Sequence, residues 1–237
     1  MNISFPQNLI FFQDLILQRT TPFLELGGAN ALKEWMLNGN KDQLTRYLVD
    51  NDLLNVYLEK VTNEIANDVN QLIKFSEINA VDNLVSIGPG NGILELFFYI
   101  QKPFKKILLI DIESSLTHQH SFYDEGSGYA SLKSTKNFLI ANNIPAEKIF
   151  ICNPKNNSLP SFKFDLLISI ISMGFHYPCN DYADFILTNI DKAGSLIFDK
   201  RKNVLDIGFQ RLSECLKIKN QIESGKRIRV FFKAKSE

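Results

Sequence analysis

Five short apolar runs constrain the fold of this chain more than any other feature of its sequence. They begin near residue 80, alternate with stretches of helical periodicity, and are each bounded by Gly, Pro, Asn or a charged residue. Short apolar runs without strict alternation are typical of strands that are covered on both faces. The pattern therefore predicts an α/β fold with a parallel sheet built from NLVSI, KKILLID, KIFICN, FDLLISI and SLIFD.

The two ends of the chain depart from this pattern. Residues 1–78 show helical periodicity and almost no strand signal, with one apolar stripe on one or two helices. The stripe consists of Leu44, Leu48, Leu54, Leu58, Val61, Ile65, Val69 and Leu72. At the other end, ECLKIKNQIE and KRIRVFFKAK flank Ser224-Gly225, which predicts an antiparallel hairpin with a tight turn. We expect a helical segment over residues 1–78 and an α/β domain over residues 79–237.

A glycine-rich turn follows the first apolar run. Gly88, Gly90 and Gly92 lie between the strand expected at 84–87 and the helical run ILELFFYI. Glycine permits positive φ and close approach of a ligand, and the N–H groups that begin a helix favour negative charge. A dinucleotide fingerprint requires glycine where the chain has Ile93, and no Gly-Lys-Ser/Thr follows for a phosphate loop. The turn alone fits a ligand cradle or a purely structural role.

An acidic residue ends the second apolar run. Asp111 closes KKILLID, at the tip of the strand expected beside the glycine turn. A carboxylate at this place can accept hydrogen bonds from both hydroxyls of a ribose. Glu113 is an alternative that points to the other face if the strand still alternates, and Asp111 can instead cap a following helix, in competition with Ser114 and Ser115. Turn, strand and acid together predict a nucleoside site.

Residues 80–237 resemble the class I S-adenosylmethionine-dependent methyltransferases. The matching pieces are VSIGPGNG, LLIDIE, IFICN, FDLLISIISMGFHYP and GSLIFD, in this order. The resemblance implies a Rossmann-like, doubly wound, mostly parallel sheet of seven strands. It also implies methionine over the glycine turn, ribose on Asp111 and adenine near Asn153, where many relatives have aspartate. The implied cofactor-binding residues are Gly88, Pro89, Gly90, Asn91, Gly92, Asp111, Ile112, Asn153 and Ser172.

The stretch SMGFHYP follows the fourth run at the carboxyl edge of the expected sheet, where doubly wound folds bind ligands. Its His176 is our candidate general base, because an imidazole of ordinary pKa can be neutral near pH 7, and Tyr177 is the next candidate. The alternative is a histidine that is only hydrogen-bonded within a loop.

The same stretch resembles a subset of these enzymes, described as sugar O-methyltransferases of surface-polysaccharide clusters. That resemblance implies O-methylation of a sugar-containing, phosphorylated or nucleotide-linked precursor of a bacterial capsule. No Asn-Pro-Pro-Tyr or Asp-Pro-Pro-Tyr element is present, which favours an oxygen acceptor over nitrogen. The alternatives are another small acceptor such as an amine or a carboxylate, an RNA, or a cofactor-binding scaffold without catalysis.

Charge and cysteine content limit partners and compartment. Lys plus Arg and Asp plus Glu number 26 each, so no overall field attracts nucleic acid or an anionic membrane. The run NLIFFQDLILQ is too short for a membrane span and has no basic residue before it, so we predict a packed amphipathic helix, with surface association left open. Cys152, Cys179 and Cys215 lack disulfide or zinc spacing, which predicts free thiols in a reducing cytoplasm. The small-molecule acceptor is what the resemblance implies.

Several polar groups carry weaker predictions. His118 and His120, with Asp124 or Glu125, form too weak a pattern to assign a metal. Residues 124–129 are expected to form a lid or to contact substrate. The sequence decides neither metal dependence nor the oligomeric state.

Two basic groups and three aromatic residues leave alternatives open. The run at residues 200–202 predicts either a grip on a phosphate of the acceptor or a solvated loop. The cations of the terminal hairpin predict a solubilising or edge-protecting face. Aromatic residues of the helical segment are expected in the core, with a wall of the acceptor site as the alternative. The basic run consists of Lys200, Arg201 and Lys202, and the cations of the hairpin are Lys226, Arg227, Arg229, Lys233 and Lys235. The aromatic residues are Trp35, Tyr47 and Tyr57.

Overall fold

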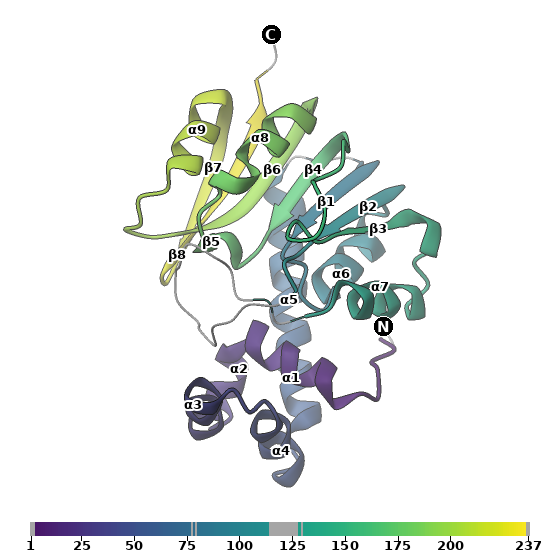
Figure 1. The fold of residues 1–237 in the computed structure, drawn as a ribbon, viewed down its shortest axis with the longest axis vertical. Coiled ribbons are helices and arrows are strands. Elements are labelled where there is room, and N and C mark those ends of the chain that lie inside the picture. The colour runs from purple at the N-terminus through teal and green to yellow at the C-terminus, as the bar shows by residue number, and fades with distance from the viewer. Residues whose placement is uncertain (1–2, 77, 79, 114–127, 129, 236–237) are drawn as a thin grey trace.

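The N-terminal part of the chain is helical (Figure 1). The computed structural model describes residues 3–76, 78, 80–113, 128 and 130–235. Within residues 3–76 the helices are α1 (Leu9–Gln18), α2 (Thr20–Glu25), α3 (Ala29–Asn38), α4 (Asp42–Asp50) and α5 (Leu54–Ser76). The predicted apolar stripe is confirmed, because α4 and the long α5 carry it and bury most of its side chains.

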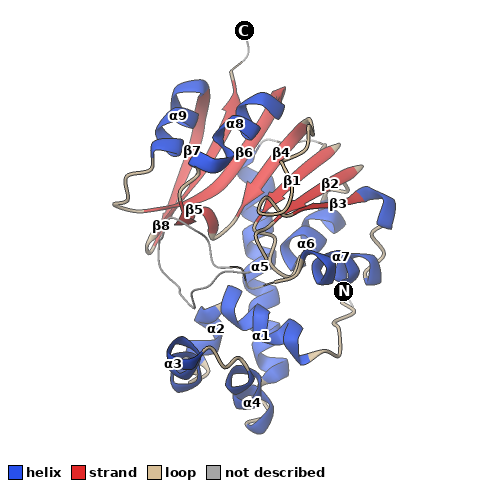
Figure 2. Ribbon diagram, in the orientation of Figure 1, coloured by secondary structure: helices blue, strands red, loops and turns tan. Residues whose placement is uncertain are grey.

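A seven-stranded sheet forms the second part (Figure 2). Its strands are β1 (Asn83–Ile87), β2 (Lys106–Ile110), β3 (Ile149–Cys152), β4 (Phe164–Ser169), β6 (Ile190–Arg201), β7 (Leu216–Ser224) and β8 (Arg227–Ala234). They lie in the order β3-β2-β1-β4-β6-β8-β7. Neighbouring strands among β3, β2, β1, β4 and β6 pair in parallel, and β8 runs antiparallel to both β6 and β7. The mostly parallel sheet with its terminal hairpin is confirmed.

Helices cover both faces of the sheet because successive side chains of each strand point to opposite sides. On β2, Ile107 and Leu109 face a core shared with α5, α6 (Ile93–Gln101) and α7 (Leu132–Ala141). Leu108 and Ile110 face a second core shared with α8 (Asn180–Asn189) and α9 (Ile207–Cys215). A short 3₁₀ helix, η1 (Ala146–Lys148), precedes β3. Burial on both faces explains why the strands read as continuous apolar runs.

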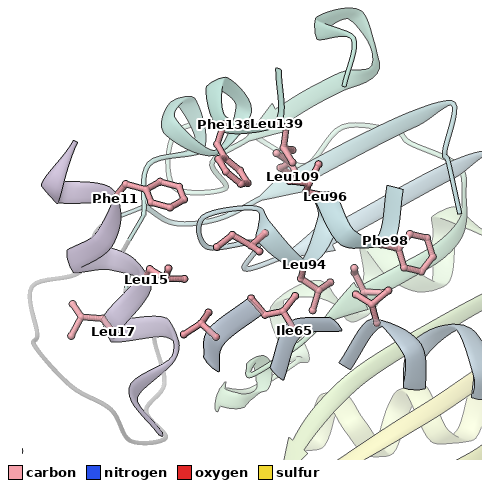
Figure 3. Close-up of a cluster of buried hydrophobic side chains, with 14 of the residues drawn as sticks. Phe11, Leu15, Leu17, Ile65, Leu94, Leu96, Phe98, Leu109, Phe138 and Leu139 are labelled. Atoms are coloured by element: carbon pink, nitrogen blue, oxygen red, sulfur yellow. The ribbon is translucent and has the colours of Figure 1, made fainter. Parts of the chain in front are cut away.

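The first helix packs onto the sheet domain through aromatic and aliphatic side chains (Figure 3). The rings of Phe11 on α1 and Phe138 on α7 have centroids 5.1 Å apart, and Leu15 on α1 is buried in the same core. Asn8 caps α1 by accepting a hydrogen bond from the amide of Ile10. The predicted amphipathic helix is confirmed, and its packing brings the end of α1 to the carboxyl edge of the sheet, beside the glycine turn.

The aromatic residues of the helical segment lie in the interior. Trp35 and Tyr57 are fully buried, and the hydroxyl of Tyr57 donates to the carbonyl oxygen of Leu15 at 3.0 Å. Tyr47 is partly buried and donates to the carbonyl oxygen of Leu26 at 2.6 Å. The core interpretation of these three side chains is confirmed.

The stretch expected after the fourth strand as a turn forms another short strand, β5 (Ser172–Tyr177). The chain breaks from β4 at Ile171, which has φ of 54°. Ser169 bridges this break, because its hydroxyl donates to the carbonyl oxygen of Ile87 and accepts from the amide of Met173. β5 is not part of the seven-strand order and contacts β6.

The prediction of a solvent-facing row of cations on the hairpin is wrong for Arg229. This side chain is 1% exposed, because β8 lies between β6 and β7 and turns this face toward α5. Its guanidinium binds both carboxylate oxygens of Asp199, at 2.8 and 3.1 Å, and Asp68 on α5 at 2.9 Å. Asp68 also pairs with Arg19 at 2.9 Å. The network joins the helical segment to the sheet.

Three further predictions concern the cysteines, a metal site and the association of helices with a membrane. Cys152 and Cys179 are buried free thiols and Cys215 is an exposed one, so the expectation of free thiols is confirmed. Among the described residues, no cluster of three or more His, Cys, Asp or Glu is arranged to hold a metal ion. None of the described helices is both long and apolar enough to cross a membrane.

Candidate functional site

The glycine turn between β1 and α6 is too tightly packed to accept other residues. Gly88 and Gly90 have φ of 70° and 57°. A Cβ on Gly88 would lie 1.9 Å from the hydroxyl oxygen of Ser172, and one on Gly90 would lie 2.3 Å from the amide oxygen of Gln18. Positive φ favours glycine at both positions, and the close approach of Ser172 adds a second requirement at Gly88. The turn therefore brings its main chain against β5 and the end of α1.

A cavity lies beside this turn, and we call it the glycine cavity. Its volume is about 100 Å³. The ends of β1 and β2, together with α6, β5 and the end of α1, supply its walls. Its polar lining includes Gly88, Gly90, Glu95, Asp111, Ser172, His176, Tyr177, Gln18 and Arg19. The structure thus brings together the glycine turn, the acid after β2 and the histidine of β5, as the sequence predicted.

Asp111 is the carboxylate at the end of β2. Burial raises the pKa of its carboxyl group to about 6, although backbone hydrogen bonds from Glu113 and Ile112 oppose this. Such a carboxylate is stabilised by hydroxyl donors from a ligand. Glu113, the alternative, is engaged elsewhere, because its carboxylate accepts from the amide of Leu132 at 2.8 Å and from the Asn153 side chain at 2.9 Å. Of these two acids, only Asp111 lines the glycine cavity.

Glu95 is a second carboxylate of this cavity, and sequence reasoning missed it. It lies on α6, is 2% exposed, and one of its oxygens accepts from the hydroxyl of Ser86 at 2.5 Å. Its other oxygen, Oε2, is buried and has no hydrogen-bond partner among the described residues. Burial raises the pKa of Glu95 to about 7. The available signal was a single charge inside the otherwise apolar helical run ILELFFYI.

His176 and Tyr177 occupy different positions in the site. His176 lines the glycine cavity and also a neighbouring cavity, so it stands at their shared wall. The hydroxyl oxygen of Tyr177 lies 3.0 Å from that of Ser172, and burial raises the pKa of Tyr177 well above its ordinary value. A phenol of raised pKa is a poor proton acceptor, because its anionic form is disfavoured. The raised pKa of Tyr177 therefore counts against this residue as a base, and the base role of His176 stays a prediction.

The neighbouring cavity is larger, about 640 Å³, and we call it the arginine cavity. It shares Leu17, Gln18, Arg19, Ile171 and His176 with the glycine cavity, so the two adjoin. Its cationic lining consists of Arg19, Arg201, Lys226 and Arg227, and its acidic lining of Glu64 and Asp68. Gln18 and Arg19 were also missed by sequence reasoning, because nothing in a helical run shows that its end reaches a distant strand.

The three basic side chains of the run at the end of β6 make different contacts. Lys200 donates to the carbonyl oxygens of Arg201 and Val204, and Lys202 pairs with Glu223 at 2.7 Å. Of the three, only Arg201 lines the arginine cavity. The run is thus neither a solvated loop nor a grip of three cations, because Lys200 and Arg201 belong to the strand itself.

Several of the predicted positions do not line the glycine cavity or lie outside the described residues. Asn91 and Gly92 of the turn are not among its lining residues. Asn153 follows β3, and its amide group donates to the carbonyl oxygen of Ile112 at 3.2 Å as well as to Glu113. Its oxygen accepts from the amide of Lys155, so adenine contact by Asn153 stays a prediction. The predictions for His118 and His120, and for the segment at 124–129, fall largely outside the described residues.

The fold resembles solved structures of methyltransferases. The chain aligns with ribosomal protein L11 methylase from Lactobacillus delbrueckii subsp. bulgaricus at a TM-score of 0.52 and 20% identity, covering 73% of this chain and 78% of that one. It aligns with N-methyltransferase NodS from Bradyrhizobium japonicum WM9, solved with S-adenosyl-L-homocysteine, at 0.53 and 13%, covering 71% and 86%. The chain has the Rossmann-like fold of these methyltransferases.

The same fold also occurs with another named activity. The [4+2]-cyclase SpnF aligns at a TM-score of 0.54 and 8% identity, covering 73% of this chain and 81% of that one. No family model and no curated protein matches the chain. The fold alone therefore does not decide the reaction, and an assignment has to rest on the residues of the two cavities.

Proposed function

We propose that the protein is an S-adenosylmethionine-dependent methyltransferase that acts on a hydroxyl group of a small acceptor. The acceptor is a sugar, or a phosphorylated or nucleotide-linked precursor of a bacterial surface polysaccharide, and His176 is the general base. One observation carries the proposal: the glycine turn, Asp111, Glu95 and His176 line one cavity at the carboxyl edge of the sheet. This is where doubly wound folds bind their ligands.

The residues of the glycine cavity fit the cofactor. When bound, S-adenosylmethionine supplies a methyl carbon activated by a positively charged sulfur, and a neutral leaving group. The buried carboxylate of Asp111 accepts hydrogen bonds from the ribose hydroxyls. The unpartnered oxygen of Glu95 accepts from the ammonium group of the methionine portion, which supplies the donor that this oxygen lacks in the protein.

The size of the glycine cavity adds a condition. At about 100 Å³ it is smaller than the roughly 300 to 1,000 Å³ of common ligand pockets. The Gln18 side chain sits on the turn, where its oxygen accepts from the amide of Asn91 at 3.0 Å. The ligand therefore extends into the arginine cavity, or the Gln18 side chain leaves Gly90 when the ligand binds.

The acceptor enters from the arginine cavity, whose wall contains His176. An imidazole at the boundary of the two cavities lies between the cofactor and an acceptor hydroxyl, where it can take up the proton released on methylation. Leu17, Gln18 and Arg19 bring the end of α1 to both cavities. The helical segment over residues 1–78 thereby acts as a cap on the substrate.

Calorimetric titration with S-adenosylhomocysteine tests this proposal. We expect the protein to bind it and the Asp111→Ala variant to bind at least about 100-fold more weakly, because two hydrogen bonds to a charged group contribute about 1.5–3 kcal/mol each. The matched control is Asp184→Ala, which removes an exposed carboxylate on α8 and leaves the affinity unchanged. Absence of binding to the parent protein rejects the assignment, and equal affinity of Asp111→Ala rejects the site.

A further inference from the structure

Arg201 and Arg227 lie directly opposite each other at the end of the β6–β8 pair. Two residues earlier on the same face, the register places Asp199 opposite Arg229, and these side chains form an ion pair. The next pair on this face, Arg201 and Arg227, joins two like charges. Like charges directly opposite each other across antiparallel strands are destabilising. Both guanidinium groups line the arginine cavity.

Two of the carboxylates near this pair, Asp199 and Asp68, are already engaged. Asp199 binds Arg229 through both oxygens, and Asp68 binds Arg19 and Arg229. Arg227 reaches these two carboxylates only at 3.4 and 3.6 Å. The walls of the cavity and the network beneath it thus hold more cations than carboxylates, namely Arg19, Arg201, Lys226, Arg227 and Arg229 against Glu64, Asp68 and Asp199.

Arg201 is the cation with an unmet hydrogen-bonding requirement. Its Nη1 atom is buried without a hydrogen-bond partner, and no carboxylate of the described residues lies within 4.0 Å of its guanidinium. The guanidinium lies over the ring of Phe175, 5.3 Å from its centroid. The Phe175 and His176 rings have centroids 5.1 Å apart. The Phe175 ring therefore contacts both this guanidinium and the imidazole.

We propose that Arg201 and Arg227, with Lys226 at the rim, form an anion subsite that binds a phosphate or diphosphate group of the acceptor. A bridging anion removes the repulsion of the opposed arginines. Because Nη1 of Arg201 is buried, this side chain has to move for Nη1 to donate to the anion. The planar fork of arginine suits two phosphate oxygens at once. The inference rests on the proposed function and narrows it, because it assigns the acceptor a phosphoryl group close to the hydroxyl that is methylated.

Titration with inorganic pyrophosphate at low ionic strength, in the presence of saturating S-adenosylhomocysteine, tests the subsite. We expect binding to the parent protein, affinity at least tenfold lower for Arg201→Gln, and an intermediate value for Arg201→Lys, which keeps the charge but loses the fork. The matched control is Arg211→Gln on α9, which removes the same charge from an exposed ion pair and leaves pyrophosphate affinity unchanged.

Thermal unfolding adds a readout that does not depend on the cofactor. Without pyrophosphate, Arg201→Gln is expected to unfold at a higher temperature than the parent, since it removes the like-charge pair. Pyrophosphate is expected to stabilise the parent more than the variant. If Arg201→Gln does not fold, Lys226→Gln, an exposed turn variant, has to weaken pyrophosphate binding severalfold. Absence of pyrophosphate binding, or equal affinity of all variants, overturns the subsite. Pyrophosphate binding through Arg201 without S-adenosylhomocysteine binding overturns the proposed function and retains the subsite.

Discussion

The two adjoining cavities have opposite electrostatic requirements. The lining of the glycine cavity includes two buried acids, and burial raises the pKa values of Asp111 to about 6 and Glu95 to about 7. Beneath the arginine cavity the buried acids Asp68 and Asp199 are paired with arginines, and Nη1 of Arg201 has no hydrogen-bond partner among the described residues. A nucleoside with a positive charge suits the first cavity and an anion suits the second. The comparison teaches that two adjoining cavities at one edge of a sheet can suit chemical groups of opposite charge, although only a few side chains lie between them.

His176 is the residue that both cavities share, and its loss is expected to have the largest effect. We expect His176→Gln to lower methyl transfer about 10²- to 10⁴-fold, the usual contribution of a general base, with unchanged affinity for S-adenosylhomocysteine. The measurement is transfer from tritium-labelled S-adenosylmethionine to a panel of nucleotide sugars. Tyr177→Phe is the paired variant. Full activity of His176→Gln together with an inactive Tyr177→Phe moves the role to Tyr177.

Arg229 keeps the acids of the arginine cavity neutralised. Arg229→Ala leaves Asp199 buried without its partner, so the free energy of unfolding is expected to fall by about 3–5 kcal/mol, measured by urea denaturation. Arg211→Ala breaks an exposed ion pair and is expected to change it by less than about 1 kcal/mol. The same Arg229 variant should bind pyrophosphate more weakly, because Arg227 is drawn to the released carboxylates. Similar stability losses in the two variants contradict the buried network.

Glu95 makes stability depend on pH in the glycine cavity. Its folded pKa of about 7 lies above the ordinary 4.5, so between these values the folded protein holds a proton that the unfolded chain has released. The contribution of Glu95 to the free energy of unfolding is therefore largest at low pH. It decreases by at most about 3 kcal/mol as the pH rises toward 7. Urea denaturation of Glu95→Gln should show a flatter profile than the parent between pH 5 and pH 7.5.

The pH dependence of ligand affinity gives a second test of Glu95. S-adenosylhomocysteine carries the ammonium group that we assign to Glu95, so its affinity should rise with pH over the same window in the parent and less in Glu95→Gln. If the parent and Glu95→Gln have parallel pH profiles of stability, Glu95 does not contribute to the difference in charge between the two cavities.

The sheet and its glycine turn were predictable because they depend on local sequence. The apolar residues of runs such as KKILLID are buried on both faces of the sheet, and Gly88 and Gly90 have conformations that other residues resist. The end of β2 places Asp111 beside the turn through simple parallel pairing. These features give the fold class, the order of the elements along the chain and the first half of the candidate site.

Contacts between distant segments were not predictable. Arg229 follows the same alternation as Arg227, and only the insertion of β8 between β6 and β7, under α5, makes it a buried partner of Asp68. Glu95 reads as an isolated charge until the packing of α1 and α5 on α6 encloses it. A single sequence contains the charges of such groups but not their partners.

Periodicity and turn chemistry in the 237 residues were sufficient for the architecture and for placing the glycine turn and Asp111 at one edge of the sheet. Tertiary packing alone decided which charges meet: it brought Gln18 to the glycine turn, buried Glu95, and set Arg201 opposite Arg227. The reason is that burial and ion pairing depend on distances between residues far apart in the chain, whereas strands and turns follow from the steric and apolar preferences of neighbours.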